Sequence, residues 1–336
     1  SGPSGGPSLR RSRQGHLFGE PPPKKRAGAE VAPADPGEDL ARLAERVPDR
    51  LRLGTSSWSF PGWRGIVWAD EASSSVLARR GLSAYASHPL LRAVGVDRTF
   101  YAPVESSVLR AYADSVPEDF RFVVKAPAAV TSPYKLGAGR GAREPNPTWL
   151  DPSVATGIAV APFVEGLGEK AGALVLQFPP LGRAAREPER FADRLGRFLE
   201  RLPPGPVYAV ELRNRELAGE PYRQALRATG ATHCVSVHPR MPSPDRQAAL
   251  VDPGGPRVVR WMLHSGLEYD DAKERYAPFD ALVDEDPDSR ESLATLALSA
   301  LEIDREVIVI ANNKAEGSAP LTVFRLAGRV VDRLET

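Results

Sequence analysis

The sequence predicts a single (β/α)8 barrel of the TIM type preceded by a polar tail. Eight short apolar or β-branched segments of strand length recur after residue 50, and amphipathic segments separate most of them. About 285 residues for eight such units is close to the usual barrel size of roughly 250 residues. The alternative, a doubly wound open sheet, is disfavoured because no Gly-x-Gly-x-x-Gly follows a strand and opens a helix.

The first element is a tail, residues 1–38, that we expect to be disordered. It is rich in Ser, Gly and Pro and carries two basic clusters, so it has too little apolar surface to offset the entropy of ordering. A short helix from Asp39 to Arg46 then leads into the folded domain, residues 39–336, because apolar residues recur there at helical spacing.

The barrel strands and helices follow in alternation. The predicted strands are Leu51–Ser56, Ala93–Thr99, Arg121–Lys125, Ala173–Phe178, Val207–Leu212, Thr232–Val237, Val258–Leu263 and Val307–Asn312. The clearest predicted helices are Ser106–Ser115, Glu187–Leu202, Pro221–Thr229 and Arg290–Ile303.

The composition is that of an ordinary globular protein. With 42% apolar residues, 26% charged residues and a net charge of +1, the chain lacks a general basic coat for nucleic acid. Cys234 is the only cysteine, which excludes an intramolecular disulfide and a cysteine-based zinc cluster and fits a reducing cytoplasm. We expect a cytoplasmic protein without a membrane partner, because no run of roughly 18 apolar residues and no secretory signal core is present.

Polar and aromatic residues follow the predicted strand ends, where a barrel builds its active face. In chain order they are Trp58 and Trp63, Asp97 and Tyr101, Lys125, Gln177, Glu211 and Arg213, His238, His264, and Asn312 and Asn313. This arrangement predicts a substrate site for an anionic or ring-bearing molecule.

Glu211 and Lys125 are the candidate catalytic residues. Glu211 would be a general acid or base, unless Arg213, two residues on, simply neutralises it. Lys125 would stabilise negative charge, and the alternative is a structural ion pair with Glu211 or Asp97.

The other candidates have binding roles. Trp58 and Trp63 would stack on a ring at the mouth, whereas Trp68 would pack in the core. The amides of Gln177, Asn312 and Asn313 would orient the substrate or tie down loops. A divalent metal held by His238 or His264 with Glu211 and Asp97 is the weaker alternative, because these residues lack ligand spacing.

Several separated motifs resemble one family. "LRLGTSSWSFPGWRG", "FRFVVKAP", "GALVLQFPP", "YAVELRN" and "VIVIANN" are similar in order and spacing to the bacterial and archaeal proteins grouped as domain of unknown function 72, the YecE-like family. The resemblance covers Leu51 to the C-terminus. It implies a TIM-barrel-like fold and a polar pocket without a settled activity, and it adds Arg260 to the pocket candidates.

The chain departs from the family pattern at one position. Before the Thr-Phe-Tyr run the family usually has Glu and Asn two residues apart, where this chain has Gly95 and Asp97. The departure raises the hypothesis of a divergent member with altered activity.

The tail contains a docking motif. Gln14, Leu17 and Phe18 in "RQGHLFGE" look like the Gln-x-x-Leu-Phe peptide by which bacterial DNA polymerases and repair proteins bind the sliding clamp. Leu-Phe suits an apolar pocket, and the flanking basic residues would attract nucleic acid. The alternative is an unremarkable basic tail, since so short a motif arises by chance.

Two functions are therefore open. The first is an enzyme of hydrolase or nuclease type acting on a nucleotide, DNA or another small anion, tethered to the DNA sliding clamp. The second is a non-catalytic binding or scaffold protein that uses the pocket and tail for recruitment.

Overall fold

The computed structural model describes residue 2 and residues 30–136 and 144–336. The chain divides at Glu30, and residues Val31–Thr336 form one compact unit. The predicted clamp peptide, Gln14, Leu17 and Phe18, lies outside the described residues.

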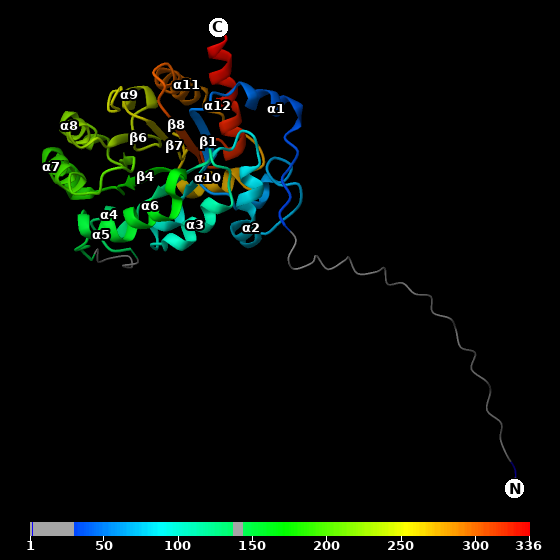
Figure 1. The fold of residues 1–336 in the computed structure, drawn as a ribbon, viewed down its shortest axis with the longest axis horizontal. Coiled ribbons are helices and arrows are strands. Elements are labelled where there is room, and N and C mark those ends of the chain that lie inside the picture. Colours follow the sequence, from blue (N-terminus) through cyan, green and yellow to red (C-terminus); the bar gives the residue numbers. More distant parts are fainter. Residues whose placement is uncertain (1, 3–29, 137–143) are drawn as a thin grey trace. The chain divides into compact units, whose positions relative to one another are not determined.

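Eight parallel strands close into a barrel in which each strand pairs with the next and the last pairs with the first (Figure 1). The strands are β1 (Leu51–Thr55), β2 (Ala93–Val96), β3 (Arg121–Lys125), β4 (Ala171–Gln177), β5 (Tyr208–Glu211), β6 (Thr232–Val237), β7 (Arg257–Trp261) and β8 (Val307–Ala311). The predicted fold class is confirmed, and seven of the eight predicted strands differ from the observed bounds by two residues or fewer at each end.

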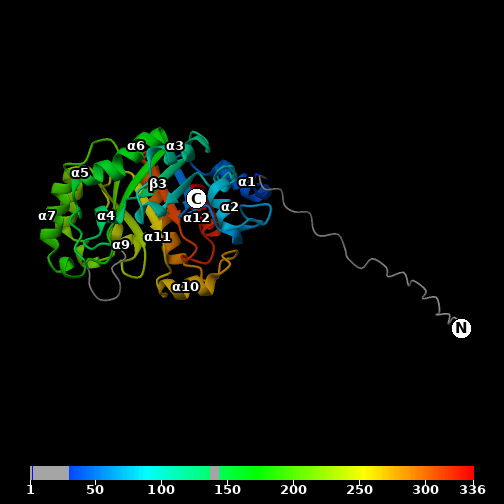
Figure 2. The ribbon, with the colours of Figure 1, turned by 90° about the horizontal axis from the view of Figure 1, so that it is seen from below.

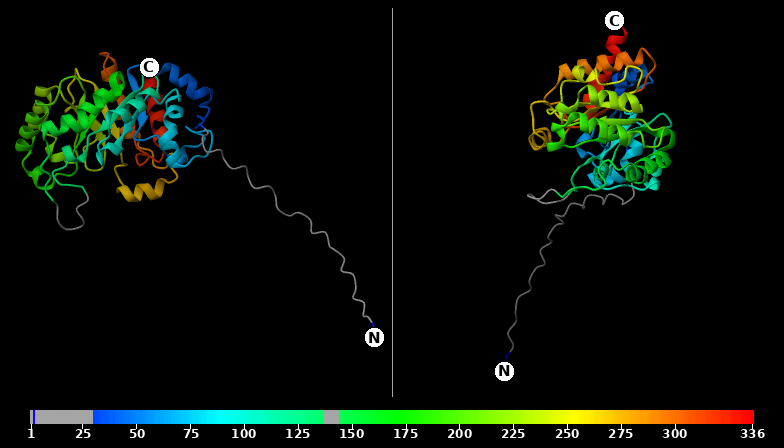
Figure 3. Two further views of the ribbon diagram at one scale, coloured as in Figure 1. Left: turned by 60° about the horizontal axis from the view of Figure 1, so that its bottom comes forward. Right: turned by 90° about the vertical axis from the view of Figure 1, so that its left-hand side faces the viewer.

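Helices surround the strands, as Figures 2 and 3 show from three further directions. They are α1 (Gly37–Arg46), α2 (Ser74–Ala86), α3 (Ser106–Asp114), α4 (Ala128–Thr131), α5 (Pro152–Ala155), α6 (Ala161–Leu167), α7 (Pro188–Leu199), α8 (Glu220–Thr229), α9 (Pro244–Ala248), α10 (Tyr269–Tyr276), α11 (Pro287–Leu301) and α12 (Ala319–Leu334). No helix within the described ranges combines the length and hydropathy that a membrane crossing requires.

The barrel interior is filled by small and branched apolar side chains from alternate strand positions. This inner cluster consists of Ala93, Val123, Ala173, Val175, Ala209, Cys234, Val258, Ile308 and Ile310. Because side chains alternate between the two faces of a strand, the next inward positions toward the strand ends are Lys125, Gln177, Glu211, Ser236 and Arg260. The alternation thus places these polar side chains directly above the apolar inner cluster.

The second predicted strand is wrong at its end. β2 stops at Val96, and Asp97–Phe100 form a 3₁₀ helix, so Asp97, Thr99 and Tyr101 do not alternate along a strand. The Thr99 hydroxyl donates hydrogen bonds to the backbone oxygens of Val96, 2.7 Å away, and Lys125, 2.6 Å away. These local bonds compete with continued strand pairing.

The folded unit begins earlier than residue 39. The Ala34 amide donates to the Val67 oxygen (2.9 Å) and the Ala69 amide donates to the Ala32 oxygen (3.0 Å), which joins residues 32–34 to the loop after β1. These hydrogen bonds join backbone groups, so the Pro-rich composition of the segment does not predict them.

Candidate functional site

Five charged side chains gather at the carboxyl ends of β2, β3, β5 and β7. We call Asp97, Lys125, Glu211, Arg213 and Arg260 the mouth cluster. All five are candidates from the sequence or the family resemblance, and ion pairs or mutual electrostatic effects connect them. With every group ionised the cluster carries three positive and two negative charges, so it favours an anion.

Glu211 is the buried centre of the mouth cluster. Its Oε1 lies 2.6 Å from Arg213 Nη1 and accepts a hydrogen bond from Ser236 Oγ at 3.0 Å, and its Oε2 lies 2.8 Å from Arg260 Nη1. Burial alone would raise the pKa of Glu211, but the charges of Arg213 and Arg260 lower it to about 2. A carboxylate so strongly ionised is a poor proton acceptor, so the geometry favours the alternative in which it neutralises and orients arginines.

Arg260 connects the two carboxylates. Its side chain is 3% exposed, and its Nη2 donates to Asp97 Oδ2 at 2.6 Å. Burial opposes the charge on Arg260, but Asp97 and Glu211 raise its pKa above the ordinary value. Asp97 itself is 32% exposed, and its Oδ1 has no hydrogen-bond partner among the described residues, so it faces the open side of the cluster.

Arg213 has unused hydrogen-bond donors. Only its Nη1 is engaged, by Glu211, Ser236 and the Leu212 oxygen. Within the described part of the chain, its Nε and Nη2 have no partner. A guanidinium fixed on one side and free on the other is suited to bind a carboxylate or phosphate.

Lys125 forms no ion pair. In the described ranges, its Nζ has neither a salt bridge nor a hydrogen bond. The Nζ lies over the ring of Phe100, 3.7 Å from the ring centroid. The expected alternative of a structural pair with Glu211 or Asp97 is therefore not what the structure contains. Burial lowers the pKa of the Lys125 amine to about 8, an effect that Asp97 opposes and Arg260 reinforces.

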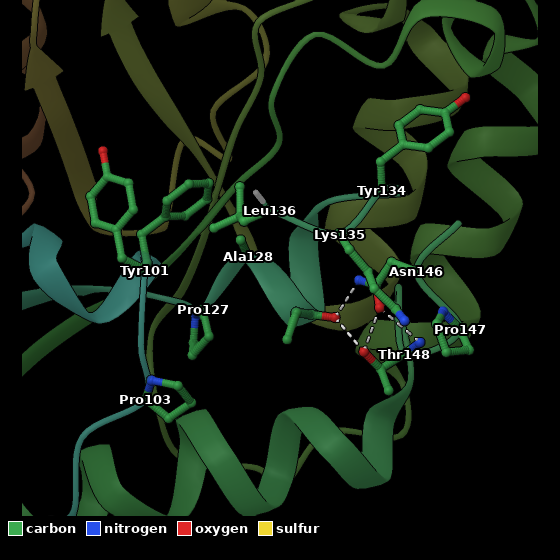
Figure 4. A pocket seen from close by; sticks show the side chains of 12 residues that line it. Tyr101, Pro103, Pro127, Ala128, Tyr134, Lys135, Leu136, Asn146, Pro147 and Thr148 are labelled. Carbon is green, nitrogen blue, oxygen red and sulfur yellow. Dashed lines mark hydrogen bonds between the residues drawn. The ribbon is translucent and has the colours of Figure 1, made fainter. Parts of the chain in front are cut away.

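An apolar cavity of about 330 Å³ has Phe100 in its wall. The Phe100 ring also contacts Lys125 of the mouth cluster, although no residue of that cluster is in the described lining of the cavity. Its described lining includes Tyr101 after β2, Pro127 after β3, and Leu136 and Thr148 in the following loop. Figure 4 shows Tyr101 and Leu136 on one side of the view and Asn146 and Thr148 on the other. The cavity matches the size of small-molecule sites.

Hydrogen bonds fix the far wall of this cavity. Asn146 Nδ2 and Thr148 Oγ1 each donate to the Ala129 oxygen at 2.8 Å (Figure 4). Tyr101, in contrast, is 77% exposed, so its ring is free to contact a ligand.

The amide candidates take different places. Gln177 lies level with Glu211 in the sheet register and is 8% exposed, and its side chain has no hydrogen bond among the described residues. Asn312 Nδ2 donates to Ser56 Oγ at 2.8 Å, which ties the ends of β8 and β1 together. Gln177 thus remains available to a ligand, and Asn312 has the loop-tying role.

Trp63 and Asn313 lie in the core. Trp63 is fully buried, Asn313 is 1% exposed, and Trp63 Nε1 donates to Asn313 Oδ1 at 3.1 Å. Trp58 is also buried and packs edge-on against Tyr112. Their burial does not fit the prediction that Trp58 and Trp63 stack on a ligand at the mouth. Trp68 is fully buried, as expected for packing.

His238 lies close enough to the mouth cluster to be affected by its charges. Burial and the charge of Arg213 lower the pKa of His238 to about 4, and Glu211 opposes this shift. His264 Nδ1 accepts a hydrogen bond from the Gly266 amide at 3.2 Å. Among residues 30–136 and 144–336, no three His, Cys, Asp or Glu side chains are grouped to hold a metal ion.

Ser236 and Lys314 were not among the predicted site residues. Ser236 binds both Glu211 and Arg213, and its inward position on β6 was a readable signal. Lys314 follows the two asparagines after β8, and its Nζ lies 4.2 Å from the centroid of the Tyr269 ring. Burial and the charge of Lys273 lower the pKa of Lys314 to about 8 as well, and the charge of Asp97 opposes this shift.

Gly95 fits a close approach of strands. A Cβ there would lie 3.0 Å from Ser56 Cα and 3.2 Å from Ile310 Cγ2. The inner cluster thus occupies the space above Gly95, and a glutamate at this position would require Ile310 to move.

The comparisons with known proteins agree on the fold. A family model described as "Protein of unknown function DUF72" matches residues 52–335. A DUF72 family protein of Thermotoga maritima superposes with a TM-score of 0.57 at 20% identity, covering 85% of this chain and 99% of that one. A DUF72 family protein of Enterococcus faecalis gives 0.56 at 18% identity, covering 84% and 95%. No curated protein matches the sequence.

Proposed function

Since the chain belongs to the DUF72 family of proteins of unknown function, we propose a function from its own site: an enzyme that binds a small anionic, ring-bearing substrate at the barrel mouth. The observation that carries the proposal is that, among the described residues, the Lys125 amine has no ion pair or hydrogen bond and Nε and Nη2 of Arg213 have no partner. The charge of Arg213 acts on Lys125, so the two groups belong to one site. Unpaired buried charge is costly, so a fold that maintains it favours a ligand that completes the pairing.

The anionic part of the substrate binds Arg213 and Lys125. The Nε and Nη2 groups of Arg213 form a planar pair of donors that matches a carboxylate or phosphate edge. Glu211 holds Arg213 and Arg260 in place, so the donors need no reorganisation when the ligand arrives.

The ring of the substrate occupies the cavity beside Phe100. Its lining of aromatic, proline and leucine side chains gives apolar contact, and exposed Tyr101 offers a face for stacking. Nucleotides combine a phosphate with a ring and are one member of this substrate class.

The reactive groups are Lys125 and Asp97 rather than Glu211. Lys125, with a pKa near 8, exchanges a proton near neutral pH. Asp97 has one carboxylate oxygen without a partner in the described residues, so it can exchange that proton with the substrate. Hydrolysis of a phosphate or carboxylate ester fits these groups, with Arg213 and Arg260 stabilising the negative charge that develops.

Calorimetric titration with phenyl phosphate, inorganic phosphate and phenol tests the binding proposal. We expect phenyl phosphate to bind most tightly, Arg213→Met to weaken it about tenfold or more, the worth of one charge-assisted contact, and Tyr101→Ala to weaken it relative to inorganic phosphate. Arg329→Met, an exposed arginine on α12, is the matched control. An affinity for phenyl phosphate that is the same in wild type and Arg213→Met would refute the proposal.

Turnover separates the enzyme from a non-catalytic binding protein. Lys125→Met should abolish hydrolysis of a substrate that the variant still binds, and the rate should rise as the pH passes about 8 if the neutral amine is the active form. Binding without turnover across nucleotide and ester substrates would favour the recruitment role.

A further inference from the structure

Lys125 differs from a structural lysine in the same protein. Buried Lys170 donates to the Ala113 oxygen at 2.8 Å and the Val116 oxygen at 2.9 Å, and lies 3.4 Å from Glu118. Lys125 has no such acceptor within the described ranges. Lys170 thus has acceptors for its ammonium group, whereas the partly exposed Lys125 and the buried Lys314 have only ring contacts among the described residues.

The position of Lys125 directs the amine to a ligand. It ends β3 at an inward position above Val123 of the inner cluster, so the side chain lies over that cluster. Its Nζ contacts Phe100, which also lines the 330 Å³ cavity. An atom of a bound molecule at the junction of cavity and mouth cluster would therefore meet the amine.

The surroundings increase the fraction of Lys125 amine in the neutral, nucleophilic form. Burial and the nearby charges of Arg260 and Arg213 act against the ammonium ion, and Asp97 and Glu211 compensate only in part, which leaves the pKa at about 8. At pH 7 such an amine is neutral in about one molecule in ten, against about one in three thousand for an ordinary lysine. Desolvation beside other cations is an established way to activate a lysine for imine formation.

We propose that Lys125 is a covalent catalyst whose amine forms an imine with the carbonyl group of an anionic aldehyde or ketone. This inference rests on the binding part of the proposed function, since Arg213 must hold the anionic group of the substrate. It replaces the ester by an aldehyde or ketone that bears a carboxylate or phosphate, and it gives Lys125 a covalent role in place of proton exchange.

The step balances without an external oxidant or reductant. The neutral Lys125 nitrogen attacks the carbonyl carbon, a C–N bond forms, and the C=O electron pair moves to oxygen. Asp97, through its free Oδ1, carries one proton from the nitrogen to that oxygen, which gives a hydroxyl group. Asp97 then carries the second nitrogen proton to the hydroxyl group as the C–O bond breaks and the nitrogen lone pair forms the C=N bond, so that water leaves and the neutral imine remains.

Borohydride reduction of the full chain, followed by peptide mass spectrometry, tests the proposal. The probes are phenylpyruvate and glyceraldehyde 3-phosphate, with benzaldehyde as the uncharged comparison. We expect one reduced adduct on Lys125 with the anionic probes, its loss in Lys125→Arg and Lys125→Met, and its retention in Lys314→Arg. Lys314 is the matched control because burial lowers its pKa to a similar value.

Arg213→Met tests whether the anion guides the reaction. The variant should reduce labelling by the anionic probes at least about tenfold, the effect of one lost charge-assisted contact. Labelling by benzaldehyde should fall much less, because it loses only the small effect of the Arg213 charge on the pKa of Lys125. Circular dichroism of each variant shows whether it folds.

The outcomes separate the two proposals. An adduct on Lys314, or unselective adducts on exposed lysines, overturns the imine. No adduct while phenyl phosphate still binds through Arg213 also overturns the imine but leaves the proposed function standing. If Lys125 is not labelled and phenyl phosphate does not bind, both the imine and the proposed function are overturned.

Discussion

Replacing the buried carboxylate at the centre of the mouth cluster should destabilise the fold in a pH-dependent way. The change is Glu211→Gln, which keeps the shape of the side chain and removes its charge. Arg213 and Arg260 then lose their bridging anion, and one buried cation remains near another without compensation.

Two estimates of the cost agree. The pKa of Glu211 falls from 4.5 to about 2 on folding, and at about 1.4 kcal/mol per pH unit the charged form contributes about 3 kcal/mol of stability at neutral pH. Removing one partner of a buried ion pair costs roughly 3–5 kcal/mol in general. We therefore expect a loss of about 3 kcal/mol in the free energy of unfolding.

The sign of the pH dependence follows from the direction of the pKa change. Because folding lowers the pKa of Glu211, its contribution is complete above the unfolded value of 4.5 and disappears as the pH falls toward about 2. The difference between wild type and Glu211→Gln should therefore shrink over that interval.

Urea denaturation followed by circular dichroism at a series of pH values measures this difference. Glu291→Gln is the matched control, because Glu291 also bridges two arginines, Arg329 and Arg333, but is 46% exposed. Its loss should cost less than about 1 kcal/mol. A Glu211→Gln effect equal to that of Glu291→Gln, or one that persists unchanged in acid, would refute the argument.

Three further predictions test other parts of the molecule. Trp63→Ala should lower the free energy of unfolding by about 3–5 kcal/mol, because it leaves a cavity at a fully buried site. An unchanged melting temperature with weakened ligand binding would instead support a ligand-binding role for Trp63. Gly95→Ala should cost about 1–3 kcal/mol through crowding with the Ser56 backbone and Ile310 Cγ2; an unchanged melting temperature contradicts the close packing. Clamp binding stays a prediction from the sequence: replacing Leu17 and Phe18 by Ala should abolish capture of a bacterial sliding clamp, and equal capture by both forms would dismiss the motif.

Much of the fold could be read from local patterns. The spacing of apolar residues predicted all eight strands, because this spacing is a property of residues that are close together in the chain. The error at β2 arose from competition between strand pairing and the hydrogen bonds of Thr99, which apolar periodicity does not reveal.

The candidate site could be predicted only as a set of residues. Lys125, Glu211 and Arg213 were expected at strand ends, and they do meet there. The sequence left open which carboxylate pairs with which cation, and it assigned Trp63 to the mouth although the structure places it in the core.

The sequence by itself determined the barrel, its strand order and the polar character of its carboxyl ends, because these follow from short-range periodicity and from the rules of parallel packing. Tertiary structure alone decided that Glu211 pairs with two arginines and that Lys125 forms no ion pair within the described part of the chain. Glu211 and Arg260 are 49 positions apart in the chain, and Asp97 and Arg260 are 163 apart. Such pairs are fixed by the register at which eight strands close, a property of the whole barrel that no local stretch of sequence contains.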